Sequence, residues 1–496
     1  MALPNVFTDA GNPPILSAQV NANFNAVDLG LFNVKNVLYG AKGDGVTDDT
    51  AAFIAAYDAA VAAGGGIVYA PAATYIVNEV STINPEDIPI FFLGDGIDLT
   101  VLKATTAVSA VIGLHCKGGV LNMTINGGAT AQNGLAFGNY TANAVVDTML
   151  LSNVRVTNIA PGSAGWLFVS ICTPGTGYFI NILTMENVVL DGPSATGQDA
   201  MGVAQVVACY AKNITIRNCN RSPNFYYIEN LMLDGCYVTG GVSTTEPCFV
   251  VDSSVQRAVV ANLNIDSSNA SAPVFEAQDC TVTESYINTP TGLWFGQPSA
   301  TLTGLSLRII SSVIAGAIVV QGSGDYGNLE VRSCRIRPQV TAPGAVLNYQ
   351  ATPTLPTLDF VGNYVDTTNV SGAVIMSNAS GCNLSNAQIT GNHIVGPKAG
   401  VMLGSTIGTL SNVLISDNLG YNPVGAMTAP TVGASPWTYT NSTGVNQTLN
   451  VSGGTVSAIS ANGVVTGLLA GSFLVPAGET LVVTYTAAPT ISASGN

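Results

Sequence analysis

The stretch GAKGDGVTDDTAAFIAAYDAAVAAGGGIVYAPAATYIV, residues 40–77, decides the fold of this chain. Its alanine-rich middle, residues 50–63, predicts a helix whose apolar side chains share one face, namely Phe53, Tyr57 and Val61. Short apolar segments predict strands on both sides of this helix, at residues 36–39, 67–69 and 75–77. The stretch therefore predicts a strand, a helix and two further strands in close succession.

Three aspartates at the start of the stretch allow two interpretations. As a group, Asp44, Asp48 and Asp49 would supply a metal or acid–base cluster, although their spacing fits no calcium-binding loop. Each also has a local role, because Asp44 lies in a glycine-rich turn and the other two fall in the first turn of a helix capped by Thr47. Gly64 is expected to end that helix. We therefore expect these aspartates to have structural roles at the start of the fold and not to form a metal or catalytic site.

The same stretch closely resembles the entry motif of the pectate-lyase-like proteins, which are right-handed parallel β-helices. The resemblance covers about 40 residues. It implies that the short helix caps the N-terminal end of the β-helix. It implies a fold more than an activity, because the superfamily includes lyases, hydrolases, epimerases and non-catalytic spikes.

The composition suits an all-β protein with uncharged polar turns. Only 9% of the 496 residues are charged, against about 25% in typical soluble domains, while 47% are hydrophobic. The formal net charge of −15 makes nucleic acid an unsuitable partner and disfavours docking on anionic membranes. No apolar run is long enough to span a membrane, and the start of the chain has no signal peptide pattern. We expect synthesis and folding in a cytoplasm.

Cysteine and histidine usage argues against a metal site. The nine cysteines are irregularly spaced without a C-x-x-C motif, so neither a disulfide framework nor a zinc site is predicted. We expect most of them to be buried thiols. The two histidines, His115 and His393, cannot form a histidine-rich centre. No cofactor is therefore predicted.

Two repeating strand patterns support the β-helix independently of the resemblance. The first is a short apolar strand that recurs at ten places between Leu135 and Leu403, mostly in steps of about 19 to 31 residues. The second alternates apolar and polar residues and ends in a small or amide residue, as in NLMLDGCYV (230–238) and TLDFVGNYV (357–365). Together they predict about a dozen coils within residues 31–425.

The small or amide position of the second pattern forms a column. It reads Cys236, Ser285, Ser312, Cys334, Asn363 and Asn392, and Cys219 and Asn418 are assigned to it as well. Equivalent residues on stacked coils lie about 4.8 Å apart, so amides in this column can bond to one another. The residue that follows the column in each coil should face outward, because side chains alternate along a strand. These residues are Tyr237, Tyr286, Val313, Arg335, Tyr364 and His393.

The two ends of the chain differ from the coils. Residues 1–30 resemble the short virion-attachment segment of phage tail and spike proteins, through the helical pattern of residues 17–28. Residues 426–496 show short alternating strands separated by glycine-rich turns, which predicts a small β-sandwich. A module this small and uncharged is expected to trimerise, with glycan binding as the alternative.

Scarce carboxylates suggest where chemistry would occur. We aligned Glu229, Asp252, Gln278 and Gln297 in one column, with Glu276 on the same face two residues before Gln278. Glu229 and Asp252 one coil apart would approach the spacing of about 5–5.5 Å found in retaining glycosidases, whereas Glu229 and Glu276 would approach the inverting spacing of about 6.5–9.5 Å. The alternative is a solvated polar edge without catalytic function.

Aromatic residues accompany these acids. Substrate binding is assigned to Tyr226, Tyr227, Trp294 and Phe295, whose outward-facing members would stack on sugar rings. A lyase would need a basic residue as catalytic base and often a calcium-binding acidic cluster. Residues 212–257 supply lysine and arginine, but no acidic triad accompanies them. A hydrolase is therefore favoured over a lyase.

These features favour a homotrimeric bacteriophage tailspike or tail-fibre protein. Its expected location is the virion tail, where the N-terminus would contact other tail or baseplate proteins and the coils would bind bacterial surface polysaccharide. Cleavage of that polysaccharide by Glu229, Asp252 and Glu276 is a further possibility. The remaining alternatives are a structural virion protein, such as a baseplate or capsid decoration, and a non-viral polysaccharide lyase.

Overall fold

The computed structural model describes most of the chain. The described residues are 30–82, 88–138, 146–160, 165–170, 180–192, 199–219, 221–240, 247–267, 272–296, 301–321, 323–339, 344–350, 357–377, 382–398, 400, 402–421, 425–442 and 446–495. Contacts divide the chain into two compact units, Met1–Ser243 and Thr244–Asn496. The first 29 residues, including the predicted attachment segment, lie outside the described residues.

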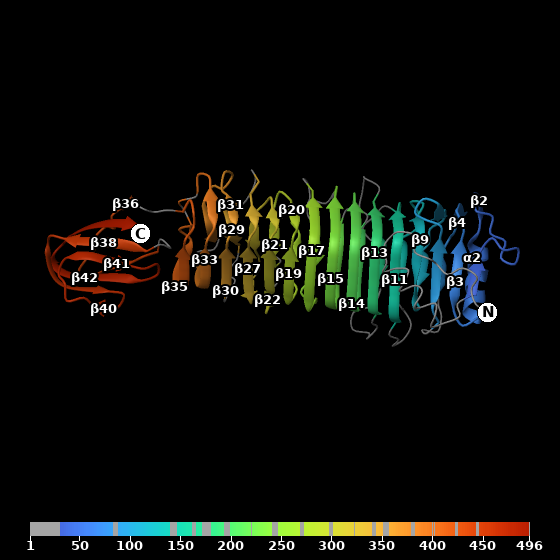
Figure 1. Ribbon diagram of the computed structural model, residues 1–496, viewed down its shortest axis with the longest axis horizontal. Helices are drawn as coiled ribbons and strands as arrows, with labels where there is room; N and C mark the ends of the chain where they lie inside the picture. The colour runs from blue at the N-terminus through green and yellow to red at the C-terminus, as the bar shows by residue number, and fades with distance from the viewer. Residues whose placement is uncertain are drawn as a thin grey trace. The chain divides into compact units, whose positions relative to one another are not determined.

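The first unit is a stack of parallel coils (Figure 1). One sheet pairs each strand in parallel with the next, in the order β1 (Gly30–Asn33), β3 (Gly66–Ala70), β6 (Ile90–Gly94), β9 (Gly118–Asn126), β11 (Val146–Thr157), β13 (Ile180–Asp191), β14 (Asp199–Arg217) and β15 (Arg221–Thr239). From β9 on, these strands are long enough to continue into a second sheet. That sheet starts with β2 (Asp44–Asp48), β4 (Ala73–Ile76) and β7 (Thr100–Lys103). A third sheet contains β5 (Val80–Thr82), β8 (Ala110–Leu114), β10 (Asn133–Phe137), β12 (Trp166–Ser170) and the first part of β14.

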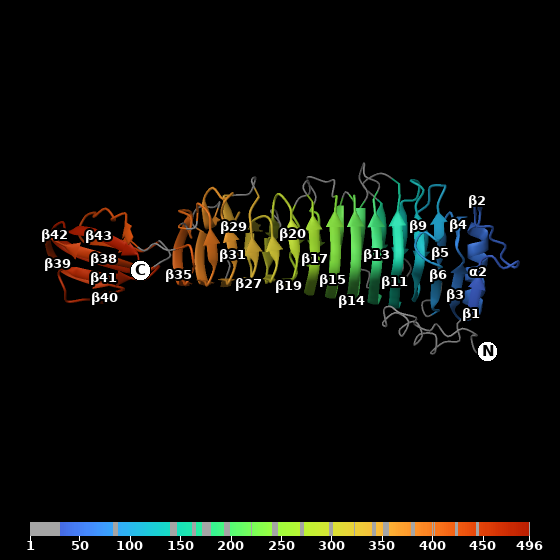
Figure 2. The same cartoon turned by 45° about the horizontal axis from the view of Figure 1, so that its top comes forward.

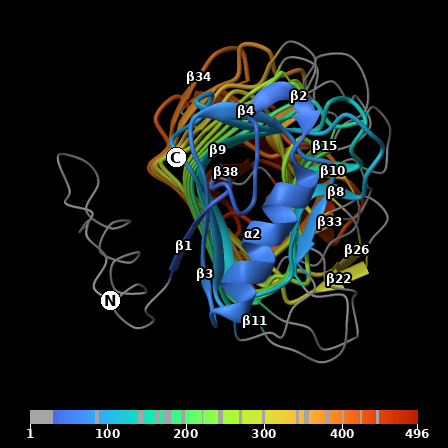
Figure 3. The same cartoon turned by 90° about the vertical axis from the view of Figure 1, so that its right-hand side faces the viewer.

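The predicted helix is α2 (Thr50–Ala62), and it crosses the open end of the first coils (Figure 3). Phe53 and Tyr57 are buried on its inner face, and the Phe53 ring meets Tyr75 edge-on with 5.3 Å between ring centroids. The helix ends as expected, with Gly64 at positive φ directly after the C-cap. The helix therefore closes the apolar end of the stack, as the resemblance implied.

Two details of the entry stretch were predicted wrongly. Residues 36–39 form turns, and the first strand is β1, six residues earlier. The N-cap is Asp49 rather than Thr47. The buried Asp49 carboxylate makes no capping bond to the helix and instead accepts the backbone N–H groups of Lys42 and Gly43 at 2.6 and 3.0 Å. Thr47 instead donates its hydroxyl to Asp44.

The other aspartates have local roles, as expected, but Asp48 ends strand β2 and does not lie in the first helical turn. Hydrogen bonds from the backbone of Thr47 and Val46 lower the pKa of Asp44 to about 2. Bonds from the side chain and backbone of Thr50 lower the pKa of Asp48. All three aspartates are thus engaged in the turns that lead into the helix.

The second unit has the same architecture of parallel coils (Figure 2). Its longest ladder of parallel strands is β17 (Arg257–Asp266), β19 (Asp279–Thr283), β23 (Ser306–Ile310), β27 (Asn328–Arg332), β30 (Thr357–Val361), β33 (Cys382–Thr390) and β35 (Ile407–Ser416). A second ladder contains the end of β17, β20 (Tyr286–Asn288), β24 (Val313–Ile314), β28 (Arg335–Ile336), β31 (Tyr364–Asp366) and β34 (His393–Val395). The third contains β16 (Val250–Val251), β18 (Val274–Phe275), β21 (Leu293–Phe295), β25 (Ile318–Val320), β29 (Ala345–Tyr349) and β32 (Ala373–Ser377). A separate short pair is formed by β22 (Thr301–Thr303) and β26 (Ser323–Asp325).

The predicted column of small and amide residues runs through the interior of the second unit. The side-chain amides of Asn363 and Asn392 donate to the carbonyl oxygens of Asn392 and Asn418, at 3.0 and 2.7 Å. Asn392 also accepts the backbone N–H of Asn363 and donates to the Phe360 carbonyl. Ser312 accepts the backbone N–H of Ser285 in the same manner. This prediction is confirmed, and it explains why polar residues are tolerated at buried positions.

One member of that column was assigned wrongly. The register pairs Cys236 with Ile214, so Ile214 occupies the column in that coil. Cys219 lies five residues further on, after Asn218, and Asn218 turns the next corner at a φ of 56°. The error arose because two corners of the coil end in similar short motifs.

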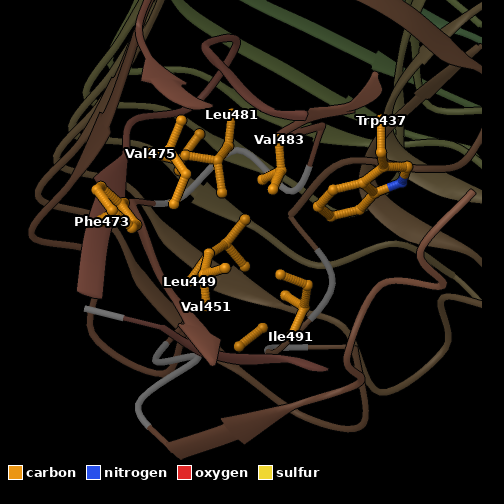
Figure 4. Close-up of a cluster of buried hydrophobic side chains, with 10 residues drawn as sticks. Trp437, Leu449, Val451, Phe473, Val475, Leu481, Val483 and Ile491 are labelled. Atoms are coloured by element: carbon orange, nitrogen blue, oxygen red, sulfur yellow. The ribbon is translucent and has the colours of Figure 1, made fainter. Parts of the chain in front are cut away.

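The C-terminal residues form the predicted β-sandwich. One sheet has the order β36 (Gly425–Met427), β43 (Thr490–Gly495), β38 (Gln447–Ser452) and β41 (Gly471–Val475). The other has the order β37 (Trp437–Thr440), β42 (Thr480–Ala487), β39 (Thr455–Ala461) and β40 (Val464–Val465). Both sheets are antiparallel, and both contribute to one apolar core that includes Leu449, Phe473, Trp437 and Leu481 (Figure 4). The first strand of the sandwich, β36, begins one residue before the predicted boundary at residue 426.

Burial should make the cysteines unreactive in the native protein. Seven described cysteines are buried free thiols, and burial raises the pKa of Cys209 and Cys236, among others, to about 12. We expect an aromatic disulfide reagent at neutral pH to leave these seven unlabelled until guanidinium unfolds the chain. Peptide mapping after labelling reports each cysteine separately. Fast native labelling of any of the seven would contradict the burial.

The amide column should contribute to stability at Asn392. Asn392→Ala leaves the Asn363 N–H and the Phe360 carbonyl unpaired in the interior, so we expect a loss of roughly 2–4 kcal/mol in the free energy of unfolding. Asn383→Ala is the matched control, because Asn383 is exposed although it also accepts two hydrogen bonds, from Thr409. Chemical denaturation midpoints measure both variants. Equal losses would mean that the buried column has no special role.

Candidate functional site

Two of the predicted substrate-binding residues come together on β15 in the first unit. Tyr226 and Tyr227 meet edge-on, with ring centroids 5.9 Å apart and an angle of 69° between the ring planes. The side chain of Tyr227 is 49% exposed, and Tyr226 is half-buried. Glu229, two residues further along the strand, is exposed. This part of β15 therefore presents an aromatic pair beside a carboxylate.

The backbone at Tyr227 is unusual. Its φ of 52° lies in the left-handed region, which side chains of its size rarely adopt. Most corners of the first unit place asparagine or glycine in this conformation, as at Asn122, Asn153, Asn187 and Gly235. Tyr227 is the aromatic exception among the described residues. Its partner in the preceding coil is Gln205, which also has positive φ, at 54°.

The conformation at Tyr227 places strain at an exposed position. Side chains in such conformations cost on the order of 1–3 kcal/mol each and persist where surrounding structure enforces them. Here the long paired strands β14 and β15 hold the corner on both sides, with Ala204 opposite Tyr226 and Val206 opposite Ile228. Strain of this kind is concentrated at functional sites in proteins.

Apolar side chains extend from this corner along the outer face of the adjoining sheet. Tyr210 is paired with Met232 in the next coil, and they are 46% and 51% exposed. Ile182, on the preceding coil, is 38% exposed. These residues were not singled out in the sequence, although their place in the alternating pattern of the strands points them outward.

The structure brings Asp252 and Glu276 together in the second unit. Val251 is paired with Phe275, and the backbone N–H of Glu276 donates to the Val251 carbonyl at 2.8 Å. Asp252 and Glu276 therefore follow equivalent positions on successive coils, about 4.8 Å apart along the stack. The aligned column was wrong here, since it matched Asp252 with Gln278. Whether Glu229 lies beside these acids stays a prediction, because it belongs to the other unit.

The two acids differ in access. Asp252 is half-buried and accepts hydrogen bonds from the backbone and the hydroxyl of Ser254, at 2.9 and 2.6 Å. Glu276 is only 2% exposed. Burial and the charge of Glu276 raise the pKa of the Tyr326 hydroxyl to about 12, and that hydroxyl donates to the Gln321 carbonyl. A polymer outside the coil can therefore reach Asp252 more readily than Glu276.

The predicted aromatic residues of the second unit are less accessible. Phe295 is buried in the interior, where its ring lies 5.0 Å from that of Tyr326. Trp294, on the opposite face of the same strand, is half-buried. Phe295 thus belongs to the core and cannot stack on a sugar in this conformation.

The outward column that follows the amide column is exposed as predicted. Arg335 and His393 are exposed, Tyr286 is 39% exposed, and Tyr364 is half-buried. Their side chains form a stack, because the Arg335 guanidinium lies 5.2 Å from the Tyr364 ring centroid and the His393 ring meets Tyr364 edge-on at 5.2 Å. His393 is thus an exposed surface residue in contact with Tyr364.

No cluster of three or more histidine, cysteine or acidic side chains in the described residues is arranged to hold a metal ion. Among the same residues, no helix combines the length and the hydropathy of a membrane span.

Comparison with known proteins supports the recognised superfamily. Residues 31–243 match the family model described as rhamnogalacturonase A/epimerase, pectate lyase-like. The mannuronan C5-epimerase AlgE5 of Azotobacter vinelandii is 47% identical over 78 residues, which are 14% of this chain and 7% of that protein. Alginate lyase 7 of the same organism is 45% identical over 76 residues, or 14% of this chain and 9% of that protein. The chain thus spans less than a tenth of the length of these two relatives.

Similar solved structures are more remote. The A-module of mannuronan C5-epimerase AlgE6 from Azotobacter vinelandii has a TM-score of 0.35 and 16% identity, covering 78% of this chain and 98% of the module. The Dettilon tailspike protein has a TM-score of 0.38 and 11% identity, covering 97% of this chain and 95% of the tailspike. Similarities at this level do not indicate an activity.

Proposed function

We propose that this pectate-lyase-like β-helix protein is a bacteriophage tailspike or tail-fibre protein that binds a polysaccharide on the surface of its bacterial host. The proposal places it on the virion tail as a homotrimer, attached to other tail or baseplate proteins through its N-terminus. This proposal is compatible with the names of two relatives, a mannuronan C5-epimerase and an alginate lyase. It is also compatible with the tailspike among the similar structures. The alternative is a structural virion protein without affinity for glycans.

The observation that carries the proposal is the corner at Tyr227. An exposed tyrosine in a strained backbone conformation, next to a second tyrosine and the exposed Glu229, offers a sugar both an aromatic surface and a hydrogen-bond acceptor. The fold does not require tyrosine there, because asparagine and glycine turn most other corners of the first unit. Binding of a polymer explains why an unfavourable residue occupies this position.

Cleavage by a pair of acids is a second candidate function. In this proposal Glu229 and Asp252, which are exposed and half-buried, act on the bound polysaccharide as a glycoside hydrolase. Glu276 lies one coil after Asp252 and is buried, so in this proposal it does not touch the polysaccharide and acts only through Asp252.

Replacing Tyr227 should separate binding from folding. Tyr227→Asn introduces a residue that accepts positive φ, so we expect an unchanged or higher unfolding midpoint. Loss of the ring should weaken binding to extracted surface polysaccharide about tenfold or more, measured by calorimetry on a panel of candidate hosts. Tyr286→Asn is the control, because Tyr286 is also exposed but lies in a regular strand. Unchanged binding by Tyr227→Asn would refute the assigned site.

Product sizing tests the hydrolase candidate. Incubation of the native protein with the polysaccharide that it binds should release fragments of repeating-unit size. Glu229→Gln and Asp252→Asn should slow this release about 100-fold or more, as expected for loss of a general acid or base. Glu284→Gln, at an exposed corner of the second unit, should have no effect. Binding without fragments from the native protein would leave an adhesin that does not cleave.

A further inference from the structure

Five large apolar side chains are exposed along one stretch of the β-sandwich. Val464 and Val465 of β40 are 67% and 71% exposed. Leu468 and Leu469, in the connection that follows, are 55% and 54% exposed, and Leu474 of β41 is 49% exposed. We call these five residues the apolar strip. Isolated exposed leucines are common on protein surfaces, but contiguous ones indicate an interaction.

The apolar strip coincides with two open sheet edges. Strand β40 is the outermost strand of one sheet, and β41 is the outermost strand of the other. The short connection 466–470 joins them, so both edges lie on the same side of the sandwich. Edge strands present unpaired backbone N–H and carbonyl groups, which are prone to pair with another chain.

The strip is held in a defined conformation. The backbone N–H of Thr466 donates to the Ile459 carbonyl at 2.9 Å, and its hydroxyl donates to the same carbonyl. The Thr466 hydroxyl oxygen in turn accepts the N–H of Leu468 at 3.2 Å. The leucines therefore project outward from an ordered turn, rather than from a loop that can fold back over its own core.

The sandwich lacks the charges that normally protect such edges. Glu479 is the single acidic or basic side chain between residues 425 and 496. Natural edge strands are commonly protected by lysine or other charged side chains, and soluble surfaces are roughly 25–35% charged. Glu479 lies in the turn before β42 and is not part of the strip. Nothing charged in the strip opposes its burial.

We propose that the apolar strip is the surface through which copies of this chain associate. A second copy fits it because it presents the same uncharged apolar side chains and the same open edges. Two copies can therefore meet without removing any charge from water and without like-charge repulsion. The depletion of charged residues matches the buried centre of protein interfaces. This inference rests on the homotrimer of the proposed function but not on polysaccharide binding, and it assigns a location to the self-association.

Sedimentation velocity of the full-length chain tests the strip. We expect the native protein to sediment as a closed oligomer at micromolar concentration, and the double variant Val465→Asp/Leu469→Asp to sediment as a monomer. Thr438→Asp is the matched control, since it adds a charge to an exposed position of β37, at the opposite edge of the same sheet. That variant should remain oligomeric.

A second variant guards against misfolding. Leu468→Ser/Leu469→Ser changes only the connection between the strands, and it should weaken association at least tenfold while circular dichroism stays native. A monomeric native protein, or a Val465→Asp/Leu469→Asp variant that assembles normally, would overturn the proposal. Loss of polysaccharide binding with assembly intact would instead assign the strip to a glycan. Because polysaccharide binding is measured separately, failure of this inference and failure of the proposed function remain distinguishable.

Discussion

The parallel hydrogen bonding of each coil to the next is the interaction on which the coils depend. In this register every residue lies about 4.8 Å from its equivalent in the neighbouring coil, so the side chains of each column must pack against one another. Apolar residues and amides stack readily, as Asn363, Asn392 and Asn418 do in the interior. Like charges repel at this distance, and several charged residues of the outer faces bond to a residue of opposite sign on a neighbouring coil. Arg308 bonds to Asp279, and Arg332 bonds to Asp359. The low charge content of the chain follows from this constraint.

The same constraint limits where a binding site can form. The interior is filled by the stacked columns, so exposed strands and corners must supply any contact with a ligand. A corner has the freedom to carry different residues: at one corner Asn122 and Asn153 bond to one another between coils, whereas at another corner Tyr227 adopts positive φ. Tyr227 uses this freedom at the cost of strain, whereas Tyr364 is held between Arg335 and His393 in a regular outward stack. The strained corner is therefore the better candidate for recognition.

The β-sandwich meets the problem of strand edges differently. Within each stack of coils, the next coil covers the edge of the last one. The sandwich is antiparallel and ends on each side at an open edge, and on one side these edges carry Val464, Val465 and Leu474. An uncharged module with apolar edges gains stability when another chain covers them. Stacking of parallel coils and self-association of the sandwich thus both serve to cover strand edges that would otherwise be open.

The sequence by itself determined the class of fold, the cap helix, the amide column and the sandwich. It did so because each has a clear local signal, such as the alternation of buried and half-buried residues in β27 and β30. The ladder that includes β8, β10 and β29 is buried on both faces, so it has no alternation from which a register can be read. For that reason Asp252 was matched with Gln278 instead of Glu276.

Only the tertiary structure decided features that depend on distant contacts. The Asp49 carboxylate bonds to Lys42 and Gly43 rather than to the helix, and Phe295 is a core residue whose ring packs against Tyr326. Positive φ at Tyr227 results from the pairing of two long strands and has no signature in the residue itself. Local sequence patterns indicate which residues can stack in columns. The strand register and the backbone conformation at the corners depend instead on how the coils pack against one another.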